Sequence, residues 1–518
     1  MIKLFGKYKN DAALWLGLTA SFWLMRLWNL TILPVFVDEA IYLRWSQVMR
    51  DPNWRFIPLT DGKQPLFMWL AAFPVNLLPD PLFAGRLISV IAGFFGMIGI
   101  WFLGKELFSK PVAYLAAALY ITIPFFTFYD RLSVADGLLT VLGIWSLYLA
   151  VVLVRRVRLD LALLLGMAIG AATLTKSPGF FYLLLLPTTI LLFDFRHPQW
   201  GWRLAKLLAL WLVVAALTEL IYNVLRLSPY FYLIGQRTWD FVLTPREVMQ
   251  NGLLWWLQCR GAYLVWGCGR VFEVTEWLNG YFTAPIFAIA CFSLLVLIVK
   301  KWRVGLVLAA WSIVPLVVES TIAKGFTARY IIFASFPFII SAAAGLWWLE
   351  VRLSRFNRFA VLAVFLVLVP AMVFDFFLVT DPTKAAIVQK ERSGYLEQWS
   401  AGYGILEIAH FLQEKAKEGK PILVGTEGTF GTLPDGLQIY TRDMPNVTVV
   451  GMGQNADIYV IPPDLRNAAK EGHLAYLVVN KSRLHAANDK SLRLLATYPR
   501  PRGPEGQEEL LLYQLISP

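Results

Sequence analysis

Two adjacent carboxylates are the first candidates for chemistry in this chain, because Asp38 and Glu39 follow the first long apolar segment. The sequence Lys63-Gln64-Pro65-Leu66 lies further along the same loop, before the second long apolar segment. Two adjacent carboxylates at the mouth of a lipid-embedded protein are costly to keep unless chemistry or ion binding uses them. A carboxylate can accept the proton of an attacking hydroxyl group, and a lysine can hold a phosphate as it leaves. We therefore predict an active site in this loop, at the membrane surface.

Further ionisable residues fall at the ends of later apolar segments, on the same predicted side of the membrane. They are Arg26, Arg86, Asp136, Lys176, Glu219, Glu319, Lys324 and Arg329. A transporter that binds its substrate between broken helices should carry polar groups halfway across the membrane. The pattern instead favours a site built where helices meet the outer leaflet. A polytopic lipid or ion transporter is the alternative, and a nonenzymatic scaffold is a third.

The composition is that of a polytopic membrane protein. The 518-residue chain is 58% hydrophobic and 16% charged, whereas a soluble globular chain is close to half apolar and a quarter charged. Residues 1–380 hold 32 Lys and Arg against 19 Asp and Glu, and residues 381–518 hold 15 against 16. The positive-inside rule accounts for this uneven charge without a nucleic-acid partner. The sequence has no phosphate-binding loop of the Walker type, so ATP-driven chemistry is not expected.

Apolar runs long enough to span a bilayer predict about eleven transmembrane helices. We place them near residues 12–30, 82–102, 112–128, 137–154, 159–175, 179–194, 205–222, 281–299, 304–322, 330–349 and 359–378. Lysines and arginines recur in alternate short loops, which predicts that those loops and the amino terminus are cytoplasmic. The loop of Asp38, the turn at Lys176 and the tail after residue 380 are then extracytoplasmic.

The chain is predicted to contain two domains, a transmembrane domain at residues 1–380 and an extracytoplasmic domain at 381–518. Residues 40–49 and 65–75 are too short to span and are expected to lie in the membrane interface. The tail reads as a soluble α/β domain, with a helix at 402–417 and short strands at 422–425, 447–450, 458–461 and 474–479. The fold class is therefore mostly α, a polytopic helical bundle with external interfacial helices and a C-terminal α/β domain.

The long loop at residues 223–280 carries two further expectations. Residues 253–266 form an apolar stretch that we interpret as a lid or a short re-entrant helix. Cys259 and Cys268 lie in the same loop and could pair as a disulfide.

Five motifs recur in a fixed order at the predicted outer face. They are Val37-Asp38-Glu39-Ala40, Lys63-Gln64-Pro65-Leu66, Arg131-Leu132-Ser133-Val134-Ala135-Asp136, Lys176-Ser177-Pro178, and Lys324 with Arg329-Tyr330. The series resembles the bacterial and archaeal members of the protein O-mannosyltransferase superfamily. This is the GT-C class of polyprenyl-phosphate-sugar-dependent glycosyltransferases, which includes the lipid A aminoarabinose transferase. Each motif alone is weak, and the resemblance rests on their order over residues 10–350.

The resemblance implies an inverting transfer of one sugar to an acceptor. Asp38 is then the candidate general base, with Glu39 beside it, and Asp136 supports the acceptor or the base. The candidate contacts of the lipid phosphate and the sugar are Lys63, Arg131, Lys176, Lys324, Arg329 and Tyr330. One departure is that Lys176-Ser177-Pro178 replaces the usual Lys-Gly-Pro, which keeps the lysine and changes the turn.

Relatives with a metal near the site use a histidine there, and no histidine of this chain is predicted on the external face of the membrane region. We therefore expect no cofactor and no obligatory divalent metal. The expected partners are a polyprenyl-phosphate sugar donor, membrane lipids, and a lipid, glycan or protein acceptor. The compact loops favour a prokaryotic cell membrane, with the site and the tail extracytoplasmic. The sugar, the carrier length and the acceptor stay open.

Each candidate residue also has a structural interpretation. Asp38 and Glu39 could cap the helix that follows them, although capping needs only one acid. Asp136 could cap the fourth spanning helix in the same way. Arginines at helix ends commonly extend to lipid headgroups, and we expect this of Arg26, Arg86 and Arg329, each taken alone.

Overall fold

The computed structural model describes residues 11–250, 270–353, 357–453, 456–487 and 489–516. The predicted segment 253–266 and the Cys259-Cys268 pair lie outside these residues. The chain forms two compact units. Unit 1 comprises Met1–Asn29, Phe56–Phe67 and Leu87–Val388, and unit 2 comprises Leu30–Arg55, Met68–Arg86 and Gln389–Pro518. The domain boundary at residue 380 stays a prediction, because the two units group residues by contact and not by independent folding.

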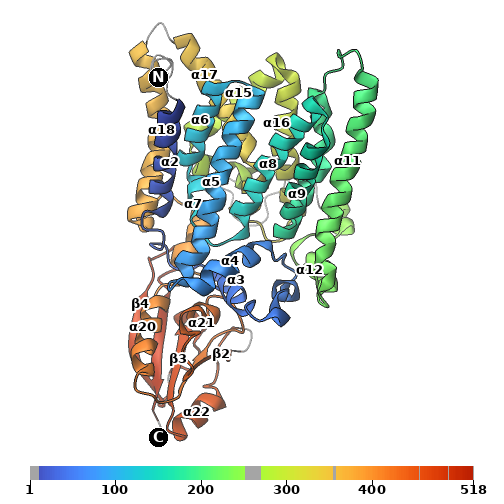
Figure 1. Cartoon of the computed structure of the whole chain (residues 1–518). Helices are drawn as coiled ribbons and strands as arrows, with labels where there is room; N and C mark the ends of the chain where they lie inside the picture. The colour runs from blue at the N-terminus through green and yellow to red at the C-terminus, as the bar shows by residue number, and fades with distance from the viewer. Residues whose placement is uncertain (1–10, 251–269, 354–356, 454–455, 488, 517–518) are drawn as a thin grey trace. The chain divides into compact units, whose positions relative to one another are not determined.

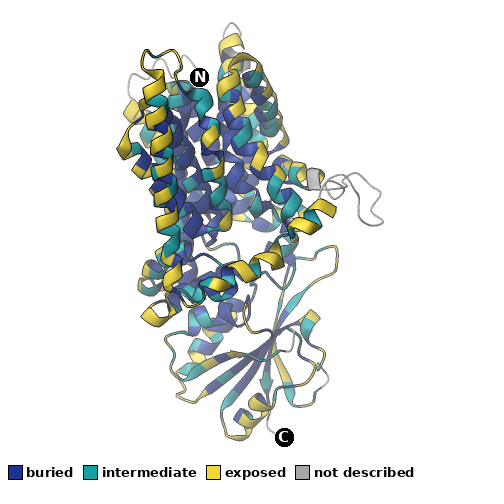
Figure 2. Cartoon of the chain, turned by 90° about the vertical axis from the view of Figure 1, so that its right-hand side faces the viewer, coloured by how far each residue is buried: buried dark blue, intermediate teal, exposed yellow. Residues whose placement is uncertain are grey.

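Unit 1 is a bundle of helices (Figure 1). Its helices are α2 (Asp11–Leu27), α5 (Pro81–Leu107, from Leu87 onward), α6 (Lys110–Thr122), α7 (Pro124–Asp130), α8 (Ala135–Arg156), α9 (Leu159–Thr175), α10 (Phe180–Leu185), α11 (Trp200–Tyr222), α12 (Phe231–Phe241), α14 (Arg270–Phe282), α15 (Ala284–Lys300), α16 (Trp302–Ile322), α17 (Phe336–Leu353) and α18 (Asn357–Thr380). Buried residues lie in the interior of this bundle and exposed residues on its outside (Figure 2). Many of the exposed residues are large and apolar, such as Leu212, Phe292 and Leu295.

Helices occur where the apolar runs predict them, but the predicted count of about eleven spans is not confirmed. Among the described residues, four helices are long and apolar enough to cross a membrane, namely Pro81–Leu107, Ala135–Arg156, Trp200–Leu227 and Trp302–Ile322. Up to seven qualify if each of three helix pairs, bent by 60°, 113° and 58°, is one span. Helix α9 illustrates the shortfall, since its 17 residues rise about 25 Å against a hydrocarbon core of about 30 Å.

Unit 2 combines segments that lie far apart in the sequence. Helix α3 (Val37–Val48) and most of α4 (Leu66–Leu77) belong to it, so helices form in both segments predicted to be interfacial. Their position in a membrane interface stays a prediction. The rest of the unit is a sheet with helices α20 (Ile405–Ala416), α21 (Asp435–Thr441) and α22 (Pro463–Lys470) (Figure 1). Helix α20 buries Ile405, Ile408 and Leu412, spaced as one face of a helix requires.

The sheet has five strands in the order β2-β1-β3-β5-β4. The strands are β1 (Ile422–Thr426), β2 (Val447–Gly451), β3 (Leu474–Asn480), β4 (Leu492–Pro499) and β5 (Glu509–Leu515). Strands β1, β2 and β3 are parallel, and β5 runs antiparallel to both β3 and β4. Three of the four predicted strands are confirmed. The fourth, at 458–461, is wrong, because only Ile458 forms an isolated bridge and the two residues after it are exposed. Strands β4 and β5 were not predicted.

Candidate active site

Helix α3 carries Asp38 and Glu39 in its first turn, where carboxylates are favoured by the helix dipole. Glu39 reaches back to the start of the helix, and its Oε2 accepts a hydrogen bond of 3.0 Å from the backbone N–H of Phe36. The side chain of Glu39 is fully buried, whereas Asp38 keeps 8% of its surface exposed. Glu39 therefore fulfils the capping role that the sequence allowed to either acid.

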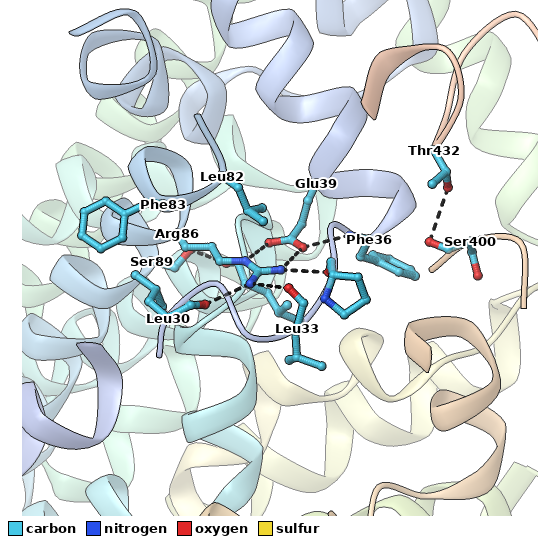
Figure 3. Close-up of polar contacts among 12 residues, drawn as sticks. Leu30, Leu33, Phe36, Glu39, Leu82, Phe83, Arg86, Ser89, Ser400 and Thr432 are labelled. Carbon is cyan, nitrogen blue, oxygen red and sulfur yellow. Dashed lines mark hydrogen bonds and ion pairs between the residues drawn. The ribbon is translucent and has the colours of Figure 1, made fainter. Parts of the chain in front are cut away.

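The second partner of Glu39 is Arg86, and the two side chains form a closed ion pair (Figure 3). Arg86 donates from Nε to Glu39 Oε1 at 2.8 Å and from Nη2 to Oε2 at 2.7 Å. Its remaining N–H groups donate to the carbonyls of Leu30, Leu33 and Pro34 at 2.9, 3.0 and 3.1 Å. Since a guanidinium has five N–H groups, this one is fully used. The prediction that Arg86 extends to lipid headgroups is wrong, because its side chain is 0% exposed and paired with Glu39.

The chain just before Asp38 is also held by the C-terminal part of unit 2. The N–H of Val37 donates to the carbonyl of Ser400 at 3.1 Å, and the N–H of Gly402 donates to the carbonyl of Val35 at 2.8 Å. The ring of Phe36 lies 4.3 Å from that of Tyr395, measured between centroids. Asp38 is thus fixed by the Glu39 and Arg86 pair and by a second segment more than 350 residues later.

Asp435, in the first turn of α21, lies in the same part of unit 2. Its Oδ2 accepts a hydrogen bond of 2.6 Å from the N–H of Gly431. Gly431 has φ +121°, and a Cβ there would lie 3.4 Å from the side chain of Val37. Burial raises the pKa of Asp435 to about 6, although the Gly431 N–H and the charge of Arg44 oppose the rise. This carboxyl group supports a loop that touches the residue preceding Asp38.

In unit 1, Lys176 brings three of the sequence motifs together. Its Nζ lies 2.6 Å from Oδ1 of Asp136 and 4.5 Å from the ring centroid of Tyr330. Lys176 is the C-cap of α9 and Asp136 lies in the first turn of α8, so each charge is favoured by its own helix dipole. The Lys176 side chain is 24% exposed and that of Asp136 is 3% exposed. This pair is accessible through its lysine.

The Lys63 motif reaches the same cluster through its glutamine. Gln64 Nε2 donates to Ser177 Oγ at 2.8 Å, so the serine that replaces the usual glycine has a hydrogen-bond partner. Lys63 forms an ion pair with Asp61 at 3.2 Å, and Asp61 also pairs with Arg237. The Lys63 side chain is 25% exposed, and its amine is already paired with one carboxylate.

The fifth motif contributes through Tyr330. The guanidinium of Arg329 lies 5.5 Å from the Tyr330 ring centroid, on the ring that Lys176 also contacts. Lys324 is exposed, and its Nζ donates to the carbonyl of Trp239 at 2.7 Å, which ties the end of α16 to α12. Arg329 thus shares a ring contact with Lys176, whereas Lys324 joins the chain after α16 to α12.

Arg131 occupies a different kind of place. It is 1% exposed and donates to the carbonyls of Met25, Arg26 and Asn29 at 3.1, 2.8 and 2.7 Å. These carbonyls end helix α2, so Arg131 caps that helix. Arg26 is 0% exposed and pairs with Asp130 at 3.1 Å, so the prediction that it extends to headgroups is wrong. The sequence does contain a signal for this pair, because Arg26 and Asp130 lie at the ends of two apolar segments on the same predicted side of the membrane.

No group of three His, Cys, Asp or Glu side chains that could hold a metal occurs among the described residues. Metal dependence stays a prediction, as does the absence of a cofactor.

Among the described residues, four helices, or up to seven segments if each bent pair is one span, are long and apolar enough to cross a membrane, as expected of a polytopic membrane protein. A family model described as Dolichyl-phosphate-mannose-protein mannosyltransferase matches residues 62–222. This span includes the motifs at Lys63, Arg131 and Lys176. The resemblance to the superfamily that the motifs indicated is therefore confirmed. No curated protein sequence matches the chain.

Solved structures share this fold over nearly the whole chain. ArnT from Cupriavidus metallidurans, bound to undecaprenyl phosphate, is 17% identical with a TM-score of 0.59, and the match covers 98% of this chain and 100% of that one. The archaeal oligosaccharyltransferase AglB from Archaeoglobus fulgidus, in complex with an inhibitory peptide and a dolichol-phosphate, is 12% identical with a TM-score of 0.52. That match covers 92% of this chain and 70% of AglB. At these identities the likeness concerns the fold.

Proposed function

We propose that the chain is an inverting glycosyltransferase that moves one sugar from a polyprenyl-phosphate donor to a lipid, glycan or protein acceptor. The proposed location is the extracytoplasmic face of a prokaryotic cell membrane, where no nucleotide donor is expected. The observation that carries the proposal is the cluster at Lys176, where motifs separated by up to 266 residues meet around one accessible amine. Solved structures of the same fold hold undecaprenyl phosphate or dolichol-phosphate, which supports a donor of this class.

In the proposed reaction, an acceptor oxygen attacks the anomeric carbon of the sugar. A new bond forms between that carbon and the acceptor oxygen, and the bond between the carbon and the phosphate oxygen breaks. The acceptor proton passes to the carboxylate of Asp38, and the electron pair of the broken bond leaves with the polyprenyl phosphate. Lys176 and Arg329 stabilise the charge that grows on this phosphate. Lys63 and Lys324 are further candidate phosphate contacts; Lys63 also pairs with Asp61, and Lys324 also donates to the carbonyl of Trp239.

The remaining motif residues are assigned positioning roles in this proposal. Asp136 orients the amine of Lys176 through their ion pair. Glu39 and Arg131 are buried and bond to other parts of the chain, so neither is assigned a contact with substrate. Tyr330 offers its ring to Lys176 and Arg329 and lines the path of the donor.

The test is transfer from a radiolabelled polyprenyl-phosphate sugar, incubated with purified protein and a membrane extract that supplies acceptor. We expect wild type to form a labelled product, and Asp38→Asn to lose about 10²- to 10⁴-fold in turnover with donor binding kept. The matched control is Asp51→Asn, an exposed acid of the same loop that belongs to no motif. Ligand flux across vesicles without a transfer product would favour a transporter. Full turnover of Asp38→Asn in folded protein would remove Asp38 as the base.

A further inference from the structure

A groove runs between helices α6, α15 and α17 of unit 1, with a volume of about 470 Å³. Its lining is largely aliphatic and aromatic, and it includes Phe292, which is 61% exposed, and Trp348, which is 40% exposed. Gly345 and Ser293 both line it, and a Cβ at Gly345 would overlap the Ser293 hydroxyl. The close approach of α15 and α17 therefore depends on this glycine.

The groove ends at two exposed lysines that follow each other at the end of α15. Lys300 Nζ lies 5.6 Å from the ring centroid of Trp348, and Lys301 Nζ lies 5.1 Å from that of Phe108. The guanidinium of Arg352 also contacts Trp348, 4.8 Å from the centroid of its ring. Glu350 is nearby in sequence, but it is buried and does not line the groove. Apolar walls thus lead to a rim that carries positive charge.

This groove is at the end of unit 1 opposite the Lys176 cluster. Helix α16 begins directly after Lys301, and its last residue comes shortly before the motif that contains Tyr330, the ring in contact with Lys176. The 21 residues of α16 correspond to a distance of about 30 Å. The groove therefore cannot be part of the site described above.

We propose that the groove binds an anionic glycerophospholipid from the surrounding bilayer. The acyl chains lie along the apolar walls, and the phosphate lies between the two lysine amines. Charge complementarity favours this occupant. An uncharged lipid would leave the two adjacent lysines without an anion, and a soluble anion would not cover the exposed aromatic residues. Basic pockets between membrane helices bind acidic headgroups in this manner. The inference is independent of the proposed glycosyl transfer.

The test is native mass spectrometry of the purified full chain with added phosphatidylglycerol or phosphatidylcholine. We expect wild type to retain phosphatidylglycerol selectively, and K300Q/K301Q to retain at least about 10-fold less, because both charge-assisted contacts to the phosphate are removed. The matched control is K105Q, since Lys105 is also exposed and lies 5.0 Å from the ring of Trp101, yet does not line the groove. Ala344→Trp, which fills the groove and keeps both lysines, is expected to reduce retention as well.

Three results would overturn the inference. One is equal retention of phosphatidylglycerol by K300Q/K301Q and K105Q. Another is equal binding of phosphatidylcholine by wild type. The third is displacement of phosphatidylglycerol by undecaprenyl phosphate at equal concentration, which would assign the groove to the carrier lipid. Thermal unfolding of each variant establishes that it is folded, and the lysine variants keep the test decisive if Ala344→Trp does not fold.

Discussion

The two units each hold an acid paired with a cation in a sequence motif, and the pairs differ in what they leave available. In unit 2, Glu39 and Arg86 are both 0% exposed, and Arg86 uses all of its N–H groups within the protein. In unit 1, Asp136 is 3% exposed but Lys176 is 24% exposed. A closed pair fixes the chain, whereas an open pair retains donors for a ligand. An acid paired with a cation therefore serves structure in one case and is suited to chemistry in the other.

Breaking the closed pair should produce the largest effect on stability. Glu39→Ala leaves the Arg86 guanidinium buried without its counter-charge, which costs about 3 to 5 kcal/mol of folding free energy. Thermal unfolding in detergent measures this loss. The control is Asp11→Ala, because Asp11 pairs with Lys110 at 2.5 Å while both side chains are about half exposed, and exposed pairs contribute about 0 to 1 kcal/mol. Equal stability of the two variants would show that the pair of Glu39 is not closed.

The buried carboxyl group of Asp435 in unit 2 should make the stability of the protein depend on pH. Its pKa is raised to about 6, so the folded chain binds this proton more tightly than the unfolded chain does. The resulting stabilisation is complete below about pH 4 and is lost as the pH rises through about 6. The free energy of unfolding then decreases by at most about 3 kcal/mol. We expect Asp435→Asn to stabilise the protein relative to wild type at pH 7.5 but not at pH 4.

The matched control for this pH series is Asp443→Asn. The Asp443 carboxyl is exposed, and its hydrogen bonds from Arg442 lower its pKa. Its contribution has the opposite sign, because it is present above the ordinary pKa of aspartate and is lost as the pH falls. A difference between Asp435→Asn and wild type that does not change with pH would mean that the carboxyl of Asp435 is solvated.

Removing the open pair should weaken donor binding and leave the fold intact. The double variant Lys176→Gln/Asp136→Asn removes the amine without leaving a buried carboxylate unpaired. We expect it to bind polyprenyl phosphate about 10- to 100-fold more weakly, the usual cost of losing hydrogen bonds to a charged group. The control is Arg158→Gln/Asp160→Asn, which removes an ion pair of 2.7 Å whose side chains are 60% and 55% exposed. Unchanged affinity in a titration would place the phosphate elsewhere.

The smallest effect is expected from the contact between two motifs. Ser177→Ala removes the hydrogen bond from Gln64, which is worth about 1 kcal/mol. We expect a small decrease in unfolding temperature and a change in donor affinity of no more than about fivefold. A larger loss of affinity would mean that Ser177 contacts the donor directly.

Much of the fold could be predicted because long apolar runs and buried strands leave strong local patterns. The helices lie where those runs are, and β1, β2 and β3 were predicted from their hydrophobic residues. The count of spans was not, because bends at short breaks such as the one before Pro124 divide an apolar run without changing its composition. Strand β4 was missed because half of its residues are exposed and its burial pattern is mixed. This reason does not apply to β5, whose residues are mostly buried.

The candidate site was predicted as a set of residues, and the division of labour within it was not. The order of motifs indicated that Lys63-Gln64, Asp136, Lys176 and Tyr330 share one face, and in unit 1 they are in contact. The sequence could not show that Glu39 and Arg86 are closed to other partners or that Arg131 is buried, because burial depends on contacts between distant segments. The pairing of Val37 with Ser400 is such a contact, and neither residue carries a local signal for it.

The most direct test is a density map of the purified protein with bound polyprenyl phosphate, because it shows which cations contact the phosphate. We expect the phosphate within hydrogen-bonding distance of Lys176 Nζ, with Arg329 beside it and with Glu39 and Arg86 still paired to each other. A phosphate bound by Arg86 or Arg131, with Lys176 remote from it, would contradict the distinction between closed and open pairs on which the proposed chemistry rests.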